Sequence, residues 1–123
     1  MKKERWIVDG MNVIGSRPDG WWRDRPGAMR ELAERLADWA DGREVTVVFD
    51  GRPFDLAVEG VTVEFASRRG PNAADDDIVR LVEADGEPAE LRVVTSDHDL
   101  ARRVRELGAQ VVSSGTFREL YEA

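Results

Sequence analysis

The feature that most constrains this chain is an apolar run, Trp6 to Val8, that leads directly into Asp9 and Gly10. A short, uninterrupted apolar run of this kind is typical of a buried strand in a parallel sheet. In open α/β sheets, ligands bind in the crevice at the carboxyl ends of the strands. The run therefore predicts a buried strand that carries a carboxylate to the edge of the sheet where ligands bind.

Similar apolar runs recur along the chain, with helical patterns between them. Further strands are expected over residues 44–49, 61–66, 91–95 and 110–113. Apolar residues at intervals of three and four predict helices over 26–40 and 73–84, a helix that ends near Gly108, and a last helix in which Thr116 and Glu119 have capping-box spacing. Asn72 is expected to cap the second of these helices. Strands that alternate with helices predict an α/β fold, a three-layer α/β/α sandwich with a central, mainly parallel sheet.

The composition fits one globular domain and excludes several kinds of site. The chain has 123 residues, 41% of them hydrophobic and 35% charged, with no repeat or linker, so we expect a single domain over residues 1–123. It has no cysteine and one histidine, which excludes disulfides, thiolate nucleophiles and polyhistidine metal sites within one chain. No apolar run reaches the length of a signal peptide or a membrane span, so we expect a cytoplasmic protein with no membrane association.

Aspartates follow the ends of three expected strands: Asp9, Asp50 and Asp97. Parallel strands all point the same way, so these side chains are expected at one edge of the sheet. A further group, Asp75 to Asp77, opens a helix. Asp75 has the spacing of the apolar residues on the inward face of that helix, whereas Asp77 turns outward and Asp76 is intermediate. The spacing therefore favours Asp75 as the inward carboxylate, with Asp76 second.

Each of these acids, taken alone, also has a structural explanation, because aspartate commonly caps helices, complements their dipole and forms turns. Several carboxylates brought together would repel one another and raise each other's pKa. A divalent ion removes that conflict, and ligands that are all oxygen suit Mg²⁺ or Mn²⁺ rather than zinc. An ion of this kind fits phosphodiester hydrolysis, in which it activates a water and stabilises charge on the phosphate oxygens.

Four polar or small residues beside these acids have candidate supporting roles. Asn12 has the spacing to orient a carboxylate or the attacking water, and a turn asparagine explains it equally well. Thr95 and Ser96 can hydrogen-bond Asp97 or the water, although strand-end packing and capping also account for them. Gly10 is expected to let the backbone turn tightly beside the metal.

The net charge of −7 argues against nucleic acid, but the positions of the arginines matter more than the total. Six arginines fall in loops that are expected to leave the same edge of the sheet as the acids: Arg17, Arg23, Arg25, Arg52, Arg68 and Arg69. With Trp21 and Trp22 available for base stacking, this edge suits single-stranded nucleic acid. The alternative interpretation is that these arginines are ordinary solvated surface residues and that one of the tryptophans belongs to the core. A second set, Arg102, Arg103 and Arg105, is expected on the exposed face of its helix.

Four segments in this order resemble the YacP-like branch of the NYN domain, a relative of PIN-domain nucleases. They are Asp9 to Gly15, Phe49 to Gly51, Ala74 to Ile78, and Thr95 to Asp99. The resemblance covers essentially the whole chain. It implies a PIN-like sandwich and metal-dependent endoribonuclease activity. It also implies that Asp9, Asp75 and Asp97 are the catalytic, metal-binding acids, accompanied by Asn12, with Asp50, Asp76 and Asp99 as second-tier ligands.

The leading hypothesis is thus a Mg²⁺- or Mn²⁺-dependent endoribonuclease that cleaves single-stranded RNA. The alternative is a catalytically inactive PIN-like module that binds RNA or protein. A phosphotransfer domain ranks last, because no lysine follows Lys3 to complete a receiver site. The sequence leaves open the RNA target, association with messenger RNA or the ribosome, the number of metals and the oligomeric state, a homodimer included.

Overall fold

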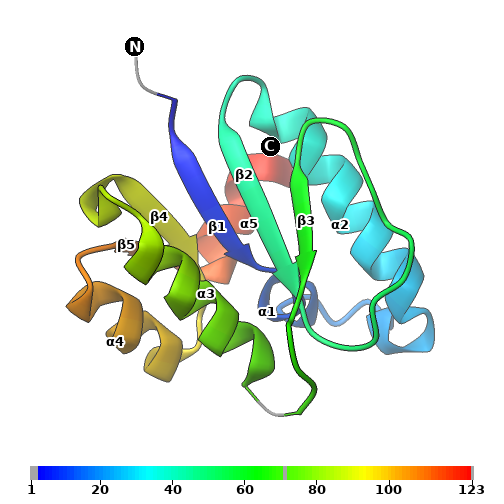
Figure 1. Cartoon of the computed structure of the whole chain (residues 1–123). Helices are drawn as coiled ribbons and strands as arrows, with labels where there is room; N and C mark the ends of the chain where they lie inside the picture. The colour runs from blue at the N-terminus through cyan, green and yellow to red at the C-terminus, as the bar shows by residue number, and fades with distance from the viewer. Residues whose placement is uncertain (1–2, 71, 123) are drawn as a thin grey trace.

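The computed structural model describes residues 3–70 and 72–122 of the chain. In this part, five strands form one sheet (Figure 1): β1 (Arg5–Asp9), β2 (Glu44–Phe49), β3 (Thr62–Phe65), β4 (Leu91–Val94) and β5 (Gln110–Val112). The α-helices are α1 (Gly10–Gly15), α2 (Arg25–Ala40), α3 (Ala73–Ala84), α4 (His98–Glu106) and α5 (Ser114–Glu122), and two 3₁₀ turns are η1 (Trp21–Arg23) and η2 (Pro88–Glu90). Within the described ranges, no helix is both long and apolar enough to cross a membrane.

Every strand pair in the sheet is parallel, and the strand order is β3-β2-β1-β4-β5. The chain starts in the middle of the sheet, moves out to one edge through β2 and β3, and then crosses back to form β4 and β5. The direction of winding therefore reverses between β1 and β4. In doubly wound folds, the carboxyl ends of the strands at such a switch point border the ligand site. In this chain Asp9 ends β1 and Thr95 follows β4 at that point.

Alternate residues of the strands pack into two hydrophobic clusters on opposite faces of the sheet. Trp6 and Val8 face a cluster with α1, α2 and α5, whereas Ile7 faces a cluster with α3 and α4. Figure 1 shows α3 and α4 on the near side of the sheet and α5 behind it. The predicted three-layer α/β/α sandwich and its parallel sheet are thereby confirmed.

The structure differs from the sequence prediction directly after β1, where a helix replaces the expected tight turn. Gly10 is the first residue of α1, and it is not among the described glycines with positive φ. A Cβ atom at Gly10 would lie 2.5 Å from two ring carbons of Phe49. Glycine at this position thus allows α1 to pack closely against β2, and the constraint is spatial rather than conformational.

Two helix caps also differ from prediction. Asn72 has φ 62° and makes no side-chain cap hydrogen bond to α3. Asp50 at the end of β2 serves instead, because its Oδ1 accepts the Ala74 N–H at 2.9 Å. The predicted capping box at Thr116 is wrong, since α5 already begins at Ser114 and Ser113 Oγ accepts the Thr116 N–H at 3.2 Å.

Candidate active site

The carboxyl edge of the sheet brings together aspartates from four segments that are far apart in the sequence. This acid group comprises Asp9 from β1, Asp50 after β2, Asp75 in the first turn of α3, and Asp97 after β4. The negative charges of the other three each raise the pKa of Asp9, so their electrostatic fields overlap there. The four acids therefore lie near enough to one another to interact electrostatically at this edge of the sheet.

Asp9 is the most deeply buried member of the acid group, with 5% of its surface exposed. Burial, and after it the charges of Asp75, Asp50 and Asp97, raise its pKa to about 7. The Thr95 hydroxyl opposes this effect by donating a hydrogen bond to Asp9 Oδ2 at 2.9 Å. Asp9 therefore titrates near neutral pH, because the fold keeps water away from its carboxylate and places other acids nearby.

Asp75 is half-buried, and its charge acts on Asp9. Burial raises its pKa, and the charges of Asp97 and Asp50 raise it further, whereas Arg103 lowers it. Asp50 lies at the junction between β2 and α3, which it joins through the hydrogen bond to Ala74 described above. The hydrogen bond between Asp50 and Ala74 fixes the start of α3 to the sheet, and this places Asp75 beside the other acids.

Asp97 has a structural role as well as its place in the acid group. Its Oδ1 accepts the N–H groups of Asp99 at 2.8 Å and Leu100 at 3.1 Å, which caps α4. Its Oδ2 accepts no hydrogen bond from the described part of the chain. The capping explanation is therefore correct for one oxygen, and the second oxygen is available to a ligand.

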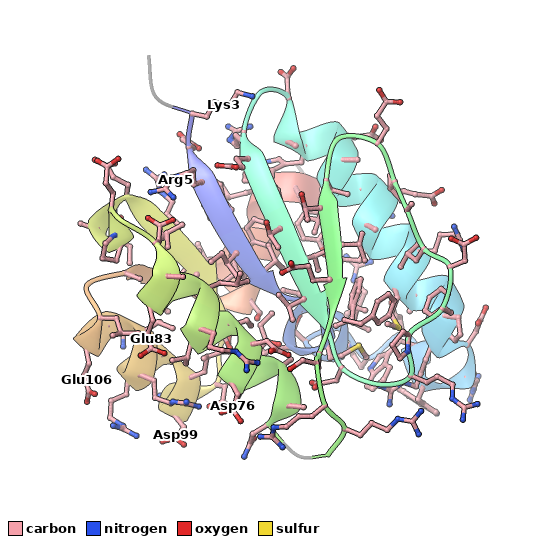
Figure 2. The ribbon with its side chains drawn as sticks, in the orientation of Figure 1. Lys3, Arg5, Asp76, Glu83, Asp99 and Glu106 are labelled. Atoms are coloured by element: carbon pink, nitrogen blue, oxygen red, sulfur yellow. The ribbon has the colours of Figure 1, made fainter. Side chains whose placement is uncertain are left out.

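Three neighbouring aspartates are held in other interactions. Asp76 accepts hydrogen bonds from Arg68 and, at 3.1 Å, from Arg103, and these arginines hold its pKa below the usual range. Asp77 accepts the Ser67 N–H at 2.6 Å and pairs with Arg80. Its side chain is 16% exposed against 36% for Asp76, so the prediction that Asp77 is the more outward of the two is wrong. Asp99 is exposed and pairs with Arg102, pointing away from the sheet in Figure 2. The structure thus places the second-tier candidates Asp76 and Asp99 in ion pairs outside the acid group.

Asn12 lies in α1, and its side chain hydrogen-bonds to the loop after β4 and to the first residue of α5 rather than to an acid. Its Oδ1 accepts the Ser96 N–H at 2.8 Å and the Ser114 hydroxyl at 2.5 Å. Ser96 Oγ in turn accepts the Ser114 N–H at 3.0 Å. Thr95 Oγ1 accepts the Asp97 N–H at 3.1 Å. Asn12, Thr95 and Ser96 therefore fix the loop that presents Asp97.

The acid group fits a divalent cation by its chemistry. Its donors are carboxylate oxygens, which suit Mg²⁺ or Mn²⁺. Across residues 3–70 and 72–122, no three His, Asp or Glu side chains are gathered closely enough to ligate one ion directly. Mg²⁺ usually keeps several water ligands and takes only one or two carboxylates from the protein. Carboxylates that interact electrostatically but are too far apart for three of them to share one ion directly, as here, are compatible with that mode of binding.

The two tryptophans of the predicted RNA surface differ in exposure. Trp22 is 56% exposed, with the Arg23 guanidinium 5.9 Å from its ring centre. Trp21 is partly buried against the core, and Arg25 lies 5.8 Å from its ring centre. An exposed ring beside a cation can stack on a base, whereas a ring packed into the core mainly stabilises the fold. Trp22 is thus the better stacking candidate.

The remaining predicted RNA-binding arginines fall into two classes. Arg17 pairs with Glu122, and Arg68 pairs with Asp76, so both are engaged within the protein. Arg52 and Arg69 are exposed and form no ion pair with any described residue. The second class leaves its positive charge open to a phosphate without breaking a contact in the fold.

Two residues near the acid group were not predicted from the sequence. Arg103 was expected on an exposed helix face, but it is only 34% exposed, contacts Asp76 and acts electrostatically on Asp75. Ser114 is fully buried and donates to Asn12. The strand-end pattern that identified the acids could have identified Ser114, which follows β5 by two positions, but no such pattern marked Arg103.

Comparisons with known proteins include a family model and crystal structures that resemble this chain. The family model described as the YacP-like NYN domain matches residues 6–123. The crystal structure of Rae1 (YacP) from Bacillus subtilis has a TM-score of 0.80 and 26% identity, covering 99% of this chain and 74% of that one. A mutant of the same Bacillus subtilis protein has a TM-score of 0.79 and 25% identity, covering 97% and 76%. Comparison with curated protein sequences gives no match.

Proposed function

Because the chain belongs to the YacP-like NYN domain family of PIN-like nucleases, we propose that its acid group is the active site of a metal-dependent endoribonuclease. The substrate is single-stranded RNA, and the reaction is hydrolysis of its phosphodiester bonds. The site lies at the switch point between β1 and β4, where doubly wound folds bind their ligands.

The observation that carries this proposal is the environment of Asp9. A carboxylate that is 5% exposed and lies near three other acids costs free energy in the metal-free fold. A structural aspartate has no need of such neighbours, because caps and turns require one carboxylate each. A bound cation offsets the repulsion, so the arrangement is advantageous when the site holds metal.

Within this site, we assign different tasks to the acids. Asp9, Asp75 and Asp97 bind Mg²⁺ or Mn²⁺ in part through water ligands, each with at least part of its carboxylate free of helix-capping bonds. Asp50 positions α3, and thereby Asp75, through its bond to Ala74. The bound ion would supply activation of water and stabilisation of charge on the phosphate oxygens.

RNA binding in this proposal depends on local contacts, since the net charge of −7 repels the phosphate backbone. Trp22 stacks on an unpaired base, while Arg52 and Arg69 contact phosphates from the loops after β2 and β3. Stacking needs an unpaired base, so the site selects single-stranded RNA over a duplex.

Cleavage of single-stranded RNA by the purified protein tests the proposal. We expect cleavage with Mn²⁺, none with EDTA, and none with the Asp97→Asn variant. The Asp99→Asn variant, which alters an exposed carboxylate in the same helix start, is the matched control and retains cleavage. Equal cleavage in all four samples would indicate a contaminant and remove the support for the proposal. RNA binding without cleavage under every metal condition would favour the non-catalytic binding module.

A further inference from the structure

We propose that Ser114, the first residue of α5, is a positioning residue that holds the Asp97 loop in place beside Asp9. This role rests on the proposed function, since it concerns the same acid group. It extends the site to the C-terminal helix, which contributes none of the acids.

Ser114 is joined to the loop after β4 and to α1 at once. Its hydroxyl donates to Asn12 Oδ1 at 2.5 Å, and its N–H donates to Ser96 Oγ at 3.0 Å. Asn12 Oδ1 also accepts the Ser96 N–H at 2.8 Å, which closes a ring of hydrogen bonds among the three residues. Ser114 is fully buried, so water does not compete for its hydroxyl.

Ser96, one member of this ring, is flanked in the sequence by Thr95, which contacts Asp9, and by Asp97 itself. Ser96 stands between Thr95, which donates to Asp9 Oδ2 at 2.9 Å, and Asp97, whose N–H binds Thr95 Oγ1 at 3.1 Å. A shift of Ser96 would therefore move Asp97 relative to Asp9. The Ser114 hydroxyl acts on the acids through this backbone and touches neither of them.

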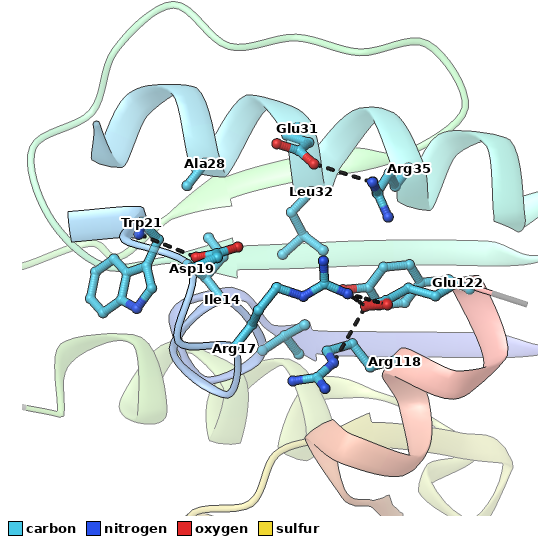
Figure 3. A pocket seen from close by; sticks show the side chains of 12 residues that line it. Ile14, Arg17, Asp19, Trp21, Ala28, Glu31, Leu32, Arg35, Arg118 and Glu122 are labelled. Atoms are coloured by element: carbon cyan, nitrogen blue, oxygen red, sulfur yellow. Dashed lines mark hydrogen bonds and ion pairs between the residues drawn. The ribbon is translucent and has the colours of Figure 1, made fainter. Parts of the chain in front are cut away.

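The helix that carries Ser114 is itself anchored, so it can serve as a fixed support. Phe117 is fully buried, with its ring centre 5.1 Å from that of Trp39. Arg118 donates to the Ser16 carbonyl at 2.7 Å, at the end of α1. Glu122 pairs with Arg17, beside a small cavity of about 50 Å³ between α1, α2 and α5 that Figure 3 shows. Contacts along its length therefore hold α5 against the rest of the fold.

The hydroxyl of Ser114 is not needed to begin α5, because the preceding residue performs that task. Ser113 Oγ accepts the Thr116 N–H at 3.2 Å and donates to Thr116 Oγ1 at 2.9 Å. Ser113 makes no hydrogen bond to Asn12 or to the Asp97 loop within the described residues. Adjacent serines thus separate helix capping from positioning, which provides a matched pair of variants.

The test compares Ser114→Ala with Ser113→Ala in the full chain, with three measurements on each. Both variants lower the thermal unfolding midpoint, since each loses a hydrogen-bonded hydroxyl. Only Ser114→Ala speeds amide hydrogen exchange at Ser96 and Asp97, measured by NMR, because these amides belong to the loop it holds. Only Ser114→Ala lowers kcat for RNA with Mn²⁺, by about 10-fold or more, with KM within about twofold, as expected when an acid is displaced.

A double-mutant cycle with Asn12→Ala adds a readout that a general stability loss would not mimic. If Ser114 acts through Asn12, Ser114→Ala has little further effect on kcat in the Asn12→Ala background. Should Ser114→Ala not fold, Ser96→Ala removes the other side-chain bond between the same segments, at an exposed residue.

Two outcomes overturn the inference: exchange at Ser96 and Asp97 equal in the two serine variants, or additive effects in the cycle. If the wild-type protein cleaves no RNA, the proposed function fails, and the exchange measurement still decides whether Ser114 holds the loop.

Discussion

Replacing Asp9 with asparagine is expected to stabilise the metal-free protein and to abolish its metal response. Burial and three neighbouring acids raise the pKa of Asp9 from 3.8 to about 7 in the fold. One pKa unit corresponds to about 1.4 kcal/mol. Ionising Asp9 in the fold therefore costs about 4 kcal/mol more than ionising it in the unfolded chain. Asparagine has nearly the same shape and can still accept the Thr95 hydroxyl, but it carries no charge.

The sign of the pH dependence follows from proton uptake. Between about pH 4 and pH 7 the folded wild type holds a proton on Asp9 that the unfolded chain has lost, so its stability falls as the pH rises. The Asp9→Asn variant has no such group. In EDTA, its free energy of unfolding should exceed that of wild type by about 4 kcal/mol at pH 8 and by less than about 1 kcal/mol at pH 4. Urea unfolding at several pH values measures this difference.

Asp76→Asn provides a control of opposite sign. Arg68 and Arg103 lower the pKa of Asp76, so this carboxylate stabilises the fold above its unfolded pKa, and its loss should lower stability at neutral pH. Adding Mn²⁺ should stabilise wild type and leave Asp9→Asn unchanged. A stability difference between Asp9→Asn and wild type that does not vary with pH would refute the electrostatic reasoning. So would a wild type that is the more stable of the two at pH 8 in EDTA.

Three further predictions follow from single contacts. Gly10→Ala should lower the free energy of unfolding by about 1–3 kcal/mol, because the new Cβ would lie 2.5 Å from a ring of β2; Gly15→Ala, whose Cβ would meet nothing closer than 4.0 Å, should not, and urea unfolding compares them. Asp75→Asn should abolish Mn²⁺-dependent RNA cleavage, whereas Asp76→Asn, whose carboxylate is already held by two arginines, should retain it; equal loss in both would mean that the helix face was misassigned. Trp22→Ala should keep the unfolding midpoint but weaken binding of single-stranded RNA by about 1–3 kcal/mol, measured by fluorescence anisotropy; unchanged affinity would place base stacking elsewhere.

Local sequence patterns predicted most of the fold, because each depends on residues close together in the chain. The apolar run from Trp6 to Val8 identified a strand that is buried on both faces, and the spacing of apolar residues placed α2 and α3 within a residue of their ends. The strand order could not be predicted, since it depends on which strands pair with β1, and local patterns do not show this. The helix α1 was also missed, because the residues after Asp9 include two glycines, Gly10 and Gly15, that favour a turn.

The positions of the acids could be predicted from the sequence, whereas the hydrogen bonds that orient them could not. Parallel strands end at one edge, so carboxylates after three of the strands are expected at the same edge without knowledge of the strand order. The bonds that orient the acids are contacts between distant segments, such as Asp50 to Ala74 and Ser114 to Asn12. No periodicity encodes them. Arg103 illustrates the same limit, since helical spacing gave its helix but not the carboxylates across from it.

The structural and functional explanations of these aspartates turn out to be complementary. The sequence presented capping and metal binding as alternatives for Asp97, yet its Oδ1 caps α4 while Oδ2 stays free. A cap fixes the orientation of the carboxylate, so it also prepares the second oxygen to bind a ligand. Asp9 differs, because the only hydrogen bond that its carboxylate accepts within the described residues comes from the Thr95 hydroxyl, and it makes no side-chain cap bond to α1. The Asp9 carboxylate therefore has no capping role that would explain its burial. Replacing Asp9 thus measures the free-energy cost of burying this acid among the others, without the loss of a helix cap.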